Sequence, residues 1–180
     1  MAERPHIREL LSADIPEIVA AFAKIGWNKP ESQYRTYLTQ QTADERLVLV
    51  ARVSDEFAGY VTVVWETEYP PFRREGIPEI KDLNVLPSFQ RRGIGSALMT
   101  EAEGAVARRS PTVGIGVGLY SDYGAAQRMY VKRGYVPDGE GVYYGARRVL
   151  PGEELPVDDS LILFLTLSAC GGASGRTGGV

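Results

Sequence analysis

The most informative segment of the sequence is Leu83-Asn84-Val85-Leu86-Pro87-Ser88-Phe89-Gln90-Arg91-Arg92-Gly93-Ile94-Gly95-Ser96. A strand pattern ends near Val85, a short loop follows, and a helical pattern opens at Gly93. The first N–H groups of a helix have no partner inside the helix, and the helix dipole makes that end attractive to anions. Glycine lets the backbone approach a phosphate closely, and Arg91 and Arg92 add positive charge at the same place. The stretch therefore predicts an anion site where a strand passes into a helix.

A simpler interpretation is that the two glycines only shape a turn, since a short glycine pattern is weak evidence by itself. Two better-defined nucleotide motifs are absent from the stretch. The dinucleotide pattern G-x-G-x-x-G fails because Leu98 stands where its third glycine belongs, and no Walker P-loop sequence occurs. The helix start and the adjacent arginines, taken together, still favour the anion site.

On both sides of this segment, the hydrophobic pattern predicts strands and helices over most of the chain. The expected strands are residues 7–10, 47–52, 57–65, 79–85, 113–119, a strand that begins at 135, and 161–167. The expected helices are one that follows Ser12 or Asp14, then residues 32–41, 93–109 and 124–132. Residues 66–78, with their adjacent prolines, are expected to form a loop near the surface. This order predicts a mixed α/β fold around one sheet, without the regular alternation of a parallel fold.

Composition narrows the class of protein. A chain of 180 residues with 44% hydrophobic and 24% charged residues is ordinary for one globular domain. Its net charge of -3 provides no field that would attract nucleic acid or an anionic membrane. With a single histidine, His6, and a single cysteine, Cys170, we expect neither an internal disulfide nor a metal site built on such ligands.

No segment reads as a membrane span or a signal sequence. The longest strongly apolar run, residues 161–167, is far shorter than the roughly 20 residues that a spanning helix needs. Residues 1–8 lack the apolar core of a signal peptide. We therefore expect a soluble cytoplasmic protein with a single domain over residues 1–168, followed by a flexible glycine-rich tail over residues 169–180.

Two motifs in order resemble the GCN5-related N-acetyltransferase (GNAT) family. Gln90, Gly93 and Gly95 occupy the defining positions of its motif A, Q/R-x-x-G-x-G/A. Motif B, A-x-x-L-Y-x-K-x-G-F, is similar to the later run Ala126-Gln127-Arg128-Met129-Tyr130-Val131-Lys132-Arg133-Gly134-Tyr135. The resemblance extends in the order of elements over residues 7–167. It implies a single mixed, mostly antiparallel sheet flanked by helices, the GNAT acyl-CoA N-acyltransferase fold, with acetyl-CoA as the acyl donor.

The resemblance also implies a cofactor site. The amides of residues 91–96 would hold the pyrophosphate of acetyl-CoA, the backbones of Leu83 and Val85 would pair with its pantetheine arm like an added strand, and motif B would flank the thioester. The implied cofactor-binding residues are Leu83, Asn84, Val85, Gln90, Arg91, Arg92, Gly93, Ile94, Gly95, Ser96 and Ala126. One departure is Tyr123, which stands where many members have an asparagine. It concerns one contact to the cofactor and leaves the expected fold unchanged.

Transfer of an acetyl group to an amine needs the amine to lose a proton, and Glu79 is the expected base. It lies four residues before Leu83 on one expected strand, and an even spacing puts both side chains on one face unless a bulge intervenes. The resemblance places an acid at this position in some members. Asp82 is the competing carboxylate. Its odd spacing from Leu83 puts its side chain on the opposite face of the strand, and a bulge would reverse this. A chain of waters is the third alternative.

Tyr130 is the expected general acid, because it falls on the tyrosine of motif B, which in many members lies near the coenzyme sulfur. A phenol with a pKa of about 10 is protonated at neutral pH and can donate to a departing thiolate. The resemblance also suggests the backbone N–H of Val85 as a donor to the oxyanion. The alternative is that Tyr130 only packs between a helix and the sheet.

The acceptor of the acetyl group cannot be read from the sequence. Candidates to line its pocket are the aromatic residues Trp27, Trp65, Tyr69, Phe72, Tyr143 and Tyr144. Glu66, Glu68 and Glu75 are candidates to attract a cationic amine. We expect an enzyme that acetylates a primary amine of a small molecule, with a protein N-terminus or lysine as the competing acceptor. An acyl-CoA-binding sensor or accessory protein without turnover is the alternative function, and homodimers are frequent in the family that the chain resembles.

Overall fold

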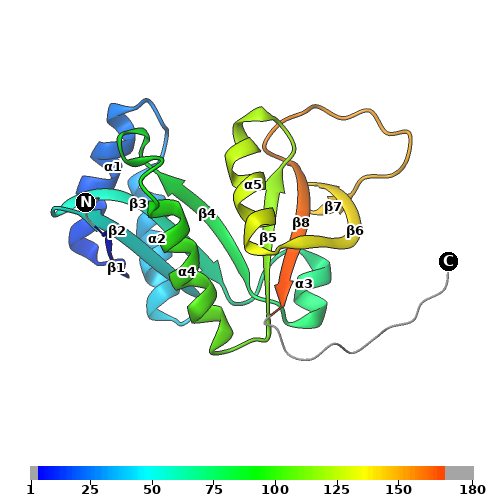
Figure 1. Ribbon diagram of the computed structural model, residues 1–180, viewed down its shortest axis with the longest axis horizontal. Coiled ribbons are helices and arrows are strands. Elements are labelled where there is room, and N and C mark those ends of the chain that lie inside the picture. The colour runs from blue at the N-terminus through cyan, green and yellow to red at the C-terminus, as the bar shows by residue number, and fades with distance from the viewer. Residues whose placement is uncertain (1–3, 169–180) are drawn as a thin grey trace.

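A computed structural model describes residues 4–168 of the chain (Figure 1). The strands are β1 (His6–Glu9), β2 (Arg46–Val53), β3 (Glu56–Val64), β4 (Glu79–Val85), β5 (Thr112–Gly118), β6 (Val136–Tyr144), β7 (Arg147–Arg148) and β8 (Leu161–Ser168). The helices are α1 (Ile15–Lys24), α2 (Glu31–Thr42), α3 (Pro70–Glu75), α4 (Ile94–Ala107) and α5 (Gly124–Arg133). Short 3-10 turns stand at Ser12–Asp14, Pro87–Phe89 and Ser121–Tyr123.

All the described strands form one 8-stranded sheet in the order β1-β2-β3-β4-β5-β8-β6-β7. Only the pair β4 and β5 is parallel, and every other neighbouring pair is antiparallel. The expectation of a single mixed, mostly antiparallel sheet flanked by helices is therefore confirmed.

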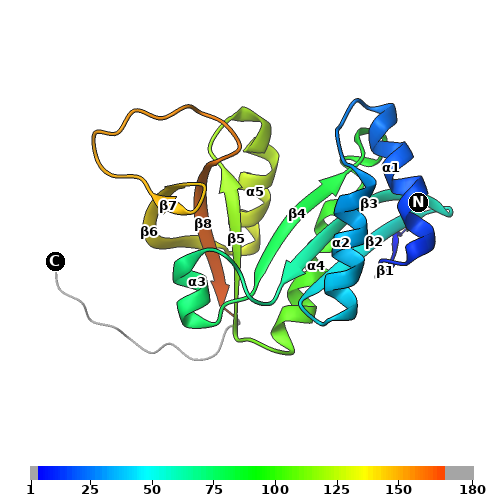
Figure 2. The same cartoon turned by 180° about the vertical axis from the view of Figure 1, so that it is seen from behind.

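Two helical layers cover the sheet. Figures 1 and 2 show α4 and α5 on one face, and α1, α2 and α3 on the other. The apolar stripe of α4 is buried against the sheet, as its periodicity predicts, with Leu98, Met99 and Ala102 all fully covered. On the opposite face, Ile18 and Phe22 of α1 pack against Tyr60 of β3. Each face of the central strands therefore has its own core.

The two central strands separate after a short start. β4 and β5 pair only at Glu79 with Gly114 and at Ile80 with Ile115. Beyond Ile80 the two strands diverge, and Figure 1 shows the widening gap between them. Because β3 continues to pair with β4 on its other side, the edge of β4 that faces β5 is left open.

A bulge in β4 changes which side chains share a face. The register with β3 advances three residues on β4, from Lys81 to Asn84, for two residues on β3. Asp82 takes a left-handed backbone at this point, with φ 54°. Glu79 consequently lies on the face of α1 and α2, as does Asp82, whereas Leu83 packs on the face of α4. The expectation that Glu79 and Leu83 share a face is wrong, and the bulge is the reason.

The expectation of a plain surface loop over residues 66–78 is also wrong, because this segment contains helix α3 (Pro70–Glu75). Its two prolines occupy the first turn, where the missing N–H groups would be unbonded in any case, and Gly76 ends the helix with φ 65°. Phe72 is buried, and its ring fills the space beside Gly114, where an added Cβ would lie 2.1 Å from it. The helix therefore closes the back of the sheet below the gap.

Two further expectations concern a membrane span and the C-terminal tail. Within residues 4–168 no helix is long and apolar enough to cross a bilayer. The expected tail over residues 169–180, with Cys170, lies outside the described residues.

Candidate active site

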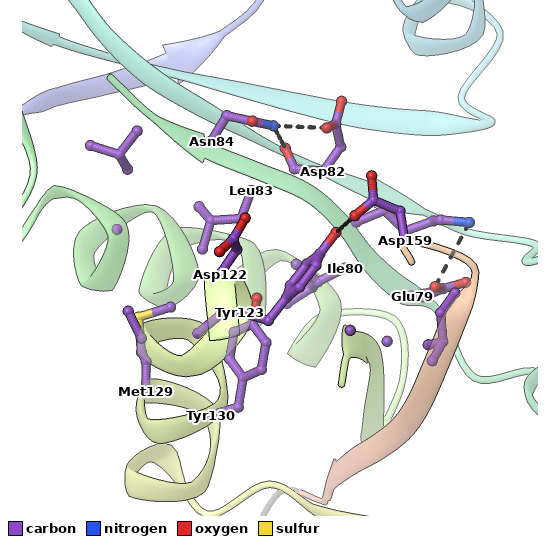
Figure 3. Close-up of a pocket in the computed structure, with 18 of the residues that line it drawn as sticks. Glu79, Ile80, Asp82, Leu83, Asn84, Asp122, Tyr123, Met129, Tyr130 and Asp159 are labelled. Carbon is purple, nitrogen blue, oxygen red and sulfur yellow. Dashed lines mark hydrogen bonds and ion pairs between the residues drawn. The ribbon is translucent and has the colours of Figure 1, made fainter. Parts of the chain in front are cut away.

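The gap between β4 and β5 leads into a cavity of about 1250 Å³. Leu83 and Tyr130 line it on the face covered by α4 and α5, while Tyr37 and Glu79 line it on the opposite face. Figure 3 shows Tyr130 and Glu79 entering the same cavity from different elements. The cavity therefore connects the two faces of the sheet through its central gap.

The amide loop, defined as residues 90–96, forms one end of this cavity. Arg91 (φ 59°) and Gly93 (φ 81°) both adopt left-handed backbone, so the chain turns sharply before α4 begins. The N–H groups of residues 91–96 have no acceptor within the described part of the chain, whereas the amides on either side, at Gln90 and Ala97, are bonded. The first turn of α4 also holds no acidic residue. The loop thus presents a row of free donors at a helix start, which is the geometry of an anion site.

All but one of the expected cofactor residues line the cavity. They are Leu83, Asn84, Val85, Gln90, Arg91, Gly93, Ile94, Gly95, Ser96 and Ala126. Arg92 is the exception, since its guanidinium lies 5.4 Å from the centroid of the Phe89 ring and faces a separate hollow of about 580 Å³. Asn84 lines the cavity but directs its amide away from the amide loop, donating to Asp82 Oδ1 at 2.7 Å. Binding of the cofactor by these residues stays a prediction.

Tyr130 lies on α5, which follows β5, and it lines the cavity. Its side chain is only 5% exposed, and its ring is 5.8 Å from that of Tyr135. The hydroxyl forms no hydrogen bond with any residue from 4 to 168. Burial raises the pKa of Tyr130 to about 12, so the phenol stays protonated well above neutral pH. A protonated, uncommitted hydroxyl that borders a cavity is chemically able to donate a proton.

Glu79 lies where β4 and β5 begin to separate. It is 3% exposed and accepts a hydrogen bond from the hydroxyl of Thr67. Lys81 is its nearest cation, with Nζ 3.8 Å from Oε1. Burial raises the pKa of Glu79. The charge of Lys81, the hydrogen bond from Thr67 and the charge of Arg46 only partly offset this effect. A carboxylate with a raised pKa is a better proton acceptor than an ordinary one, as general base catalysis requires.

Asp82, the competing carboxylate, is fully engaged instead. Its carboxylate accepts hydrogen bonds from Lys29 (2.9 Å), Gln33 (3.0 Å), Tyr37 (2.9 Å), Tyr60 and Asn84 (2.7 Å). Burial alone would raise its pKa, but the charge of Lys29 and the hydrogen bonds of Tyr60, Lys29 and Tyr37 outweigh burial and lower it. A low pKa and a full set of donors make Asp82 a poor proton acceptor. They suit it to joining α2 to the bulge of β4.

The acceptor side of the cavity only partly matches the sequence candidates. Of the aromatic candidates, Trp27 and Tyr69 line the cavity. Phe72 and Tyr143 pack behind it with Phe164. Glu68 also lines the cavity, and it is the only one of the three acidic loop candidates to do so among its described lining residues.

Three cationic side chains that the sequence did not indicate also line the cavity on the acceptor side. They are Lys29, Arg46 and Lys81. Lys81 had a readable signal, because it stands two residues after Glu79 on one strand and so shares its face. Lys29 and Arg46 precede and follow α2, and only the folded chain brings them to the cavity. Within residues 4–168, no three histidine, cysteine or acidic side chains gather as a metal-binding group.

Tyr123, the departure in motif B, has a defined place. Its hydroxyl donates to Asp159 at 3.0 Å, and the hydroxyl of Tyr120 donates to the same oxygen. An added Cβ at Gly118 would lie 2.4 Å from the Tyr123 ring, which accounts for the glycine at the end of β5. Figure 3 shows Tyr123 reaching across to Asp159. This contact ties the start of α5 to the segment between β7 and β8.

Comparisons with known proteins identify the family and the fold. Residues 7–135 match the model of the acetyltransferase (GNAT) family. An N-acetyltransferase from Staphylococcus aureus has a similar structure, with TM-score 0.68, 17% identity, and coverage of 93% of this chain and 99% of that one. A ribosomal-protein-alanine N-acetyltransferase from Brucella melitensis gives TM-score 0.66 at 21% identity, covering 91% and 99%. The protein yncA from Salmonella typhimurium, solved with its cofactor acetyl-CoA, gives TM-score 0.66 at 18% identity, covering 97% and 99%.

At these identities the likeness to solved structures shows the fold alone. No curated protein matches the chain significantly. The family match is different in kind, because it spans well over half of the 180 residues and includes both the amide loop and Tyr130. On that evidence, the chain belongs to the acetyltransferase (GNAT) family.

Proposed function

We propose that this protein is an N-acetyltransferase that moves an acetyl group from acetyl-CoA directly to a primary amine of a small molecule. One observation carries the proposal: the row of free amides in the amide loop opens onto the same cavity as Glu79 and Tyr130. An anion site and two proton-transfer groups in one cavity fit an anionic acyl donor and an amine acceptor. Family membership and the bound acetyl-CoA of yncA support the choice of donor.

The described residues fit acetyl-CoA on physical grounds. Its pyrophosphate suits the free N–H groups of residues 91–96 and the guanidinium of Arg91. Its narrow pantetheine arm suits the open edge of β4, where backbone groups beside Leu83 and Val85 lack a partner strand. When bound, the group would supply an acetyl carbon activated as a thioester.

The protein's own residues would manage the protons. In the overall reaction the C–S bond breaks, a C–N bond forms, the amine nitrogen loses two protons, and the sulfur gains one. Glu79 would accept a proton from the acceptor ammonium, because burial disfavours its charged form and makes it more basic. Tyr130 would donate to the sulfur, since its hydroxyl is protonated and otherwise unbonded in the described chain. The second proton of the amine is released to solvent. Tyr130 regains a proton as Glu79 gives up the one it accepted, which restores both side chains.

The test measures release of free thiol from acetyl-CoA with a panel of amines that includes small amines, amino acids and short peptides. We expect turnover with small amines. Tyr130→Phe should lower turnover by about 10²-fold at unchanged acetyl-CoA affinity, the lower end of general acid effects. Glu79→Gln should lose most at the lower end of the pH range in which Glu79 is ionised, because the acceptor is mostly protonated there, and its deficit should shrink as the pH rises.

Three outcomes separate the alternatives. Binding of acetyl-CoA without thiol release from any amine would identify a sensor or accessory protein. Turnover restricted to peptides would point to a protein acceptor. Wild-type rates for both variants across the pH range would mean that catalysis rests on positioning and the oxyanion donor, and that the two side chains are structural.

A further inference from the structure

The register of three neighbouring strands places Arg46 near Glu79. Arg46 of β2 pairs with Val64 of β3, and Val64 pairs in turn with Glu79 of β4. Paired residues share a face, and strands lie about 4.8 Å apart, so the two Cα atoms are separated by about 10 Å on one face of the sheet. The long side chains of Arg46 and Glu79 both line the cavity there. A cation and a proton acceptor therefore border the acceptor side together.

Arg46 is held in a fixed position. Its Nε donates to Gln40 Oε1 at 2.7 Å, and its Nη1 donates to Thr62 Oγ1 at 2.8 Å. The guanidinium also lies 4.4 Å from the centroid of the Tyr37 ring. Thr62 pairs with Lys81 in the next row of the sheet, so these contacts direct the guanidinium towards Lys81 and the cavity.

Arg46 is also unusual in forming no close ion pair, although its charge interacts with Glu79 at longer range. The half-buried arginines in residues 4–168 are Arg8, Arg46, Arg52 and Arg133. The other three each form an ion pair with an aspartate or glutamate, but Arg46 has no carboxylate within 4.0 Å among the described residues. Removing a cation from water without a carboxylate in contact is costly. A preoriented arginine whose Nη2 has no described partner is suited to a planar anion supplied by a ligand.

Building on the proposed function, we infer that the acceptor is an amine that carries a carboxylate, of the α-amino acid class. Its carboxylate binds Arg46, with Lys81 as a second cation at the rim, and its ammonium faces Glu79. Lys29 does not compete for the carboxylate, because its charge is already matched by Asp82 at 2.9 Å. The short separation between the amine and the carboxylate of an α-amino acid suits two groups that converge from either side of Val64.

The first experiment needs only the wild-type protein. Thiol release is measured for the common L-amino acids, for their carboxamides, and for the matching amines without the carboxyl carbon, with O-phosphoethanolamine included. Rates are compared after correction for the fraction of free amine at each pH. We expect the best free acid to exceed its amide and its decarboxylated amine by about 10- to 100-fold in kcat/KM, as loss of a charged hydrogen bond predicts.

Variants then assign the preference to Arg46. Arg46→Gln should lower kcat/KM for the best free acid about 10- to 100-fold, mainly through KM, and should lower it much less for the amide. Arg46→Lys should retain part of the preference, because it keeps the charge and loses the planar fork. Arg109→Gln is the matched control: Arg109 also lies over an aromatic ring, 4.1 Å from the centroid of Trp65, but away from the cavity. It should change stability without changing the preference.

The outcomes are distinguishable. Equal or better turnover of amides, plain amines or O-phosphoethanolamine would overturn the inference while leaving the proposed function intact. An equal loss of kcat/KM for acids and amides in Arg46→Gln would also overturn the inference. Arg46 would then have only a structural role, holding β2, α2 and β3 together. Absence of thiol release with every amine would overturn the proposed function, and the inference with it.

Discussion

Replacing Asp82 by asparagine separates a structural carboxylate from a catalytic one. Asparagine keeps the shape of the side chain but removes the charge and one acceptor. In the wild type, Asp82 receives hydrogen bonds from α2, from β3 and from the loop before α2. We expect Asp82→Asn to destabilise the fold and to leave the chemical step largely intact.

The size of the effect follows from burial. The side chains of Asp82 and Lys29 are only 20% and 21% exposed, so solvent screens their interaction weakly. Breaking a buried pair by removing one partner costs about 3–5 kcal/mol, and the retained amide oxygen and partial exposure reduce this to about 2–3 kcal/mol. For a chain of this size, that loss lowers Tm by about 4–12 °C.

The pH dependence has a definite sign. The pKa of Asp82 is lowered in the fold from its ordinary value of 3.8. A lowered pKa means that its stabilisation is present above the unfolded value and is lost as the pH falls through the folded value. The difference in Tm between wild type and Asp82→Asn should therefore be constant from about pH 5 to 8 and shrink below about pH 4.

Thermal unfolding and thiol release, measured on the same samples, decide the matter. Asp122→Asn is the control, since Asp122 also lines the cavity but is exposed and forms no ion pair with any described residue. It should stay within about 0.5 kcal/mol of wild type. If Asp82→Asn keeps its Tm and loses turnover by about 10²-fold or more, the reasoning is wrong and Asp82 is the base.

Three further predictions concern the glycines and the arginines of the amide loop and glycines elsewhere in the fold. Gly93→Val, forced to φ 81°, should weaken acetyl-CoA binding severely, and calorimetry showing wild-type affinity would remove the site. Arg91→Ala should weaken binding more than Arg92→Ala, because only Arg91 faces the main cavity, and the difference should shrink in high salt. Gly114→Ala should cost about 1–3 kcal/mol by overpacking, whereas Gly104→Ala, with open space around it on a helix, should stabilise by about 0.5–1 kcal/mol. Equal Tm values for these two glycine variants would contradict the packing described for α3.

The features that the sequence predicted well are local. The amide loop depends on a few consecutive residues, so glycine positions and helix periodicity were enough to locate it. The open edge of β4 could be expected only through the family resemblance, because divergence of two strands leaves no mark in either one.

The features that were missed depend on context. Helix α3 begins with two prolines, which read equally well as a break or as a first turn. The bulge at Asp82 shifts the alternation of side chains along β4. Beside it β3 approaches closely, since an added Cβ at Gly59 would lie 2.4 Å from the carbonyl oxygen of Asn84. Arg46 stands 33 positions before Glu79 in the chain, and only strand pairing makes them neighbours.

The open edge of β4 has a consequence for solubility. An unpaired strand edge is a template for aggregation, which proteins usually avoid with charges, prolines or a covering element. Here the edge from Lys81 to Val85 lies inside a notch, closed at its base by the pairing of Glu79 with Gly114 and flanked by α4 and α5. A polypeptide strand carries side chains on both faces and needs room for them, whereas a narrow, unbranched molecule needs no such room. The notch therefore keeps a reactive edge available to a slender ligand and shields it from neighbouring protein chains.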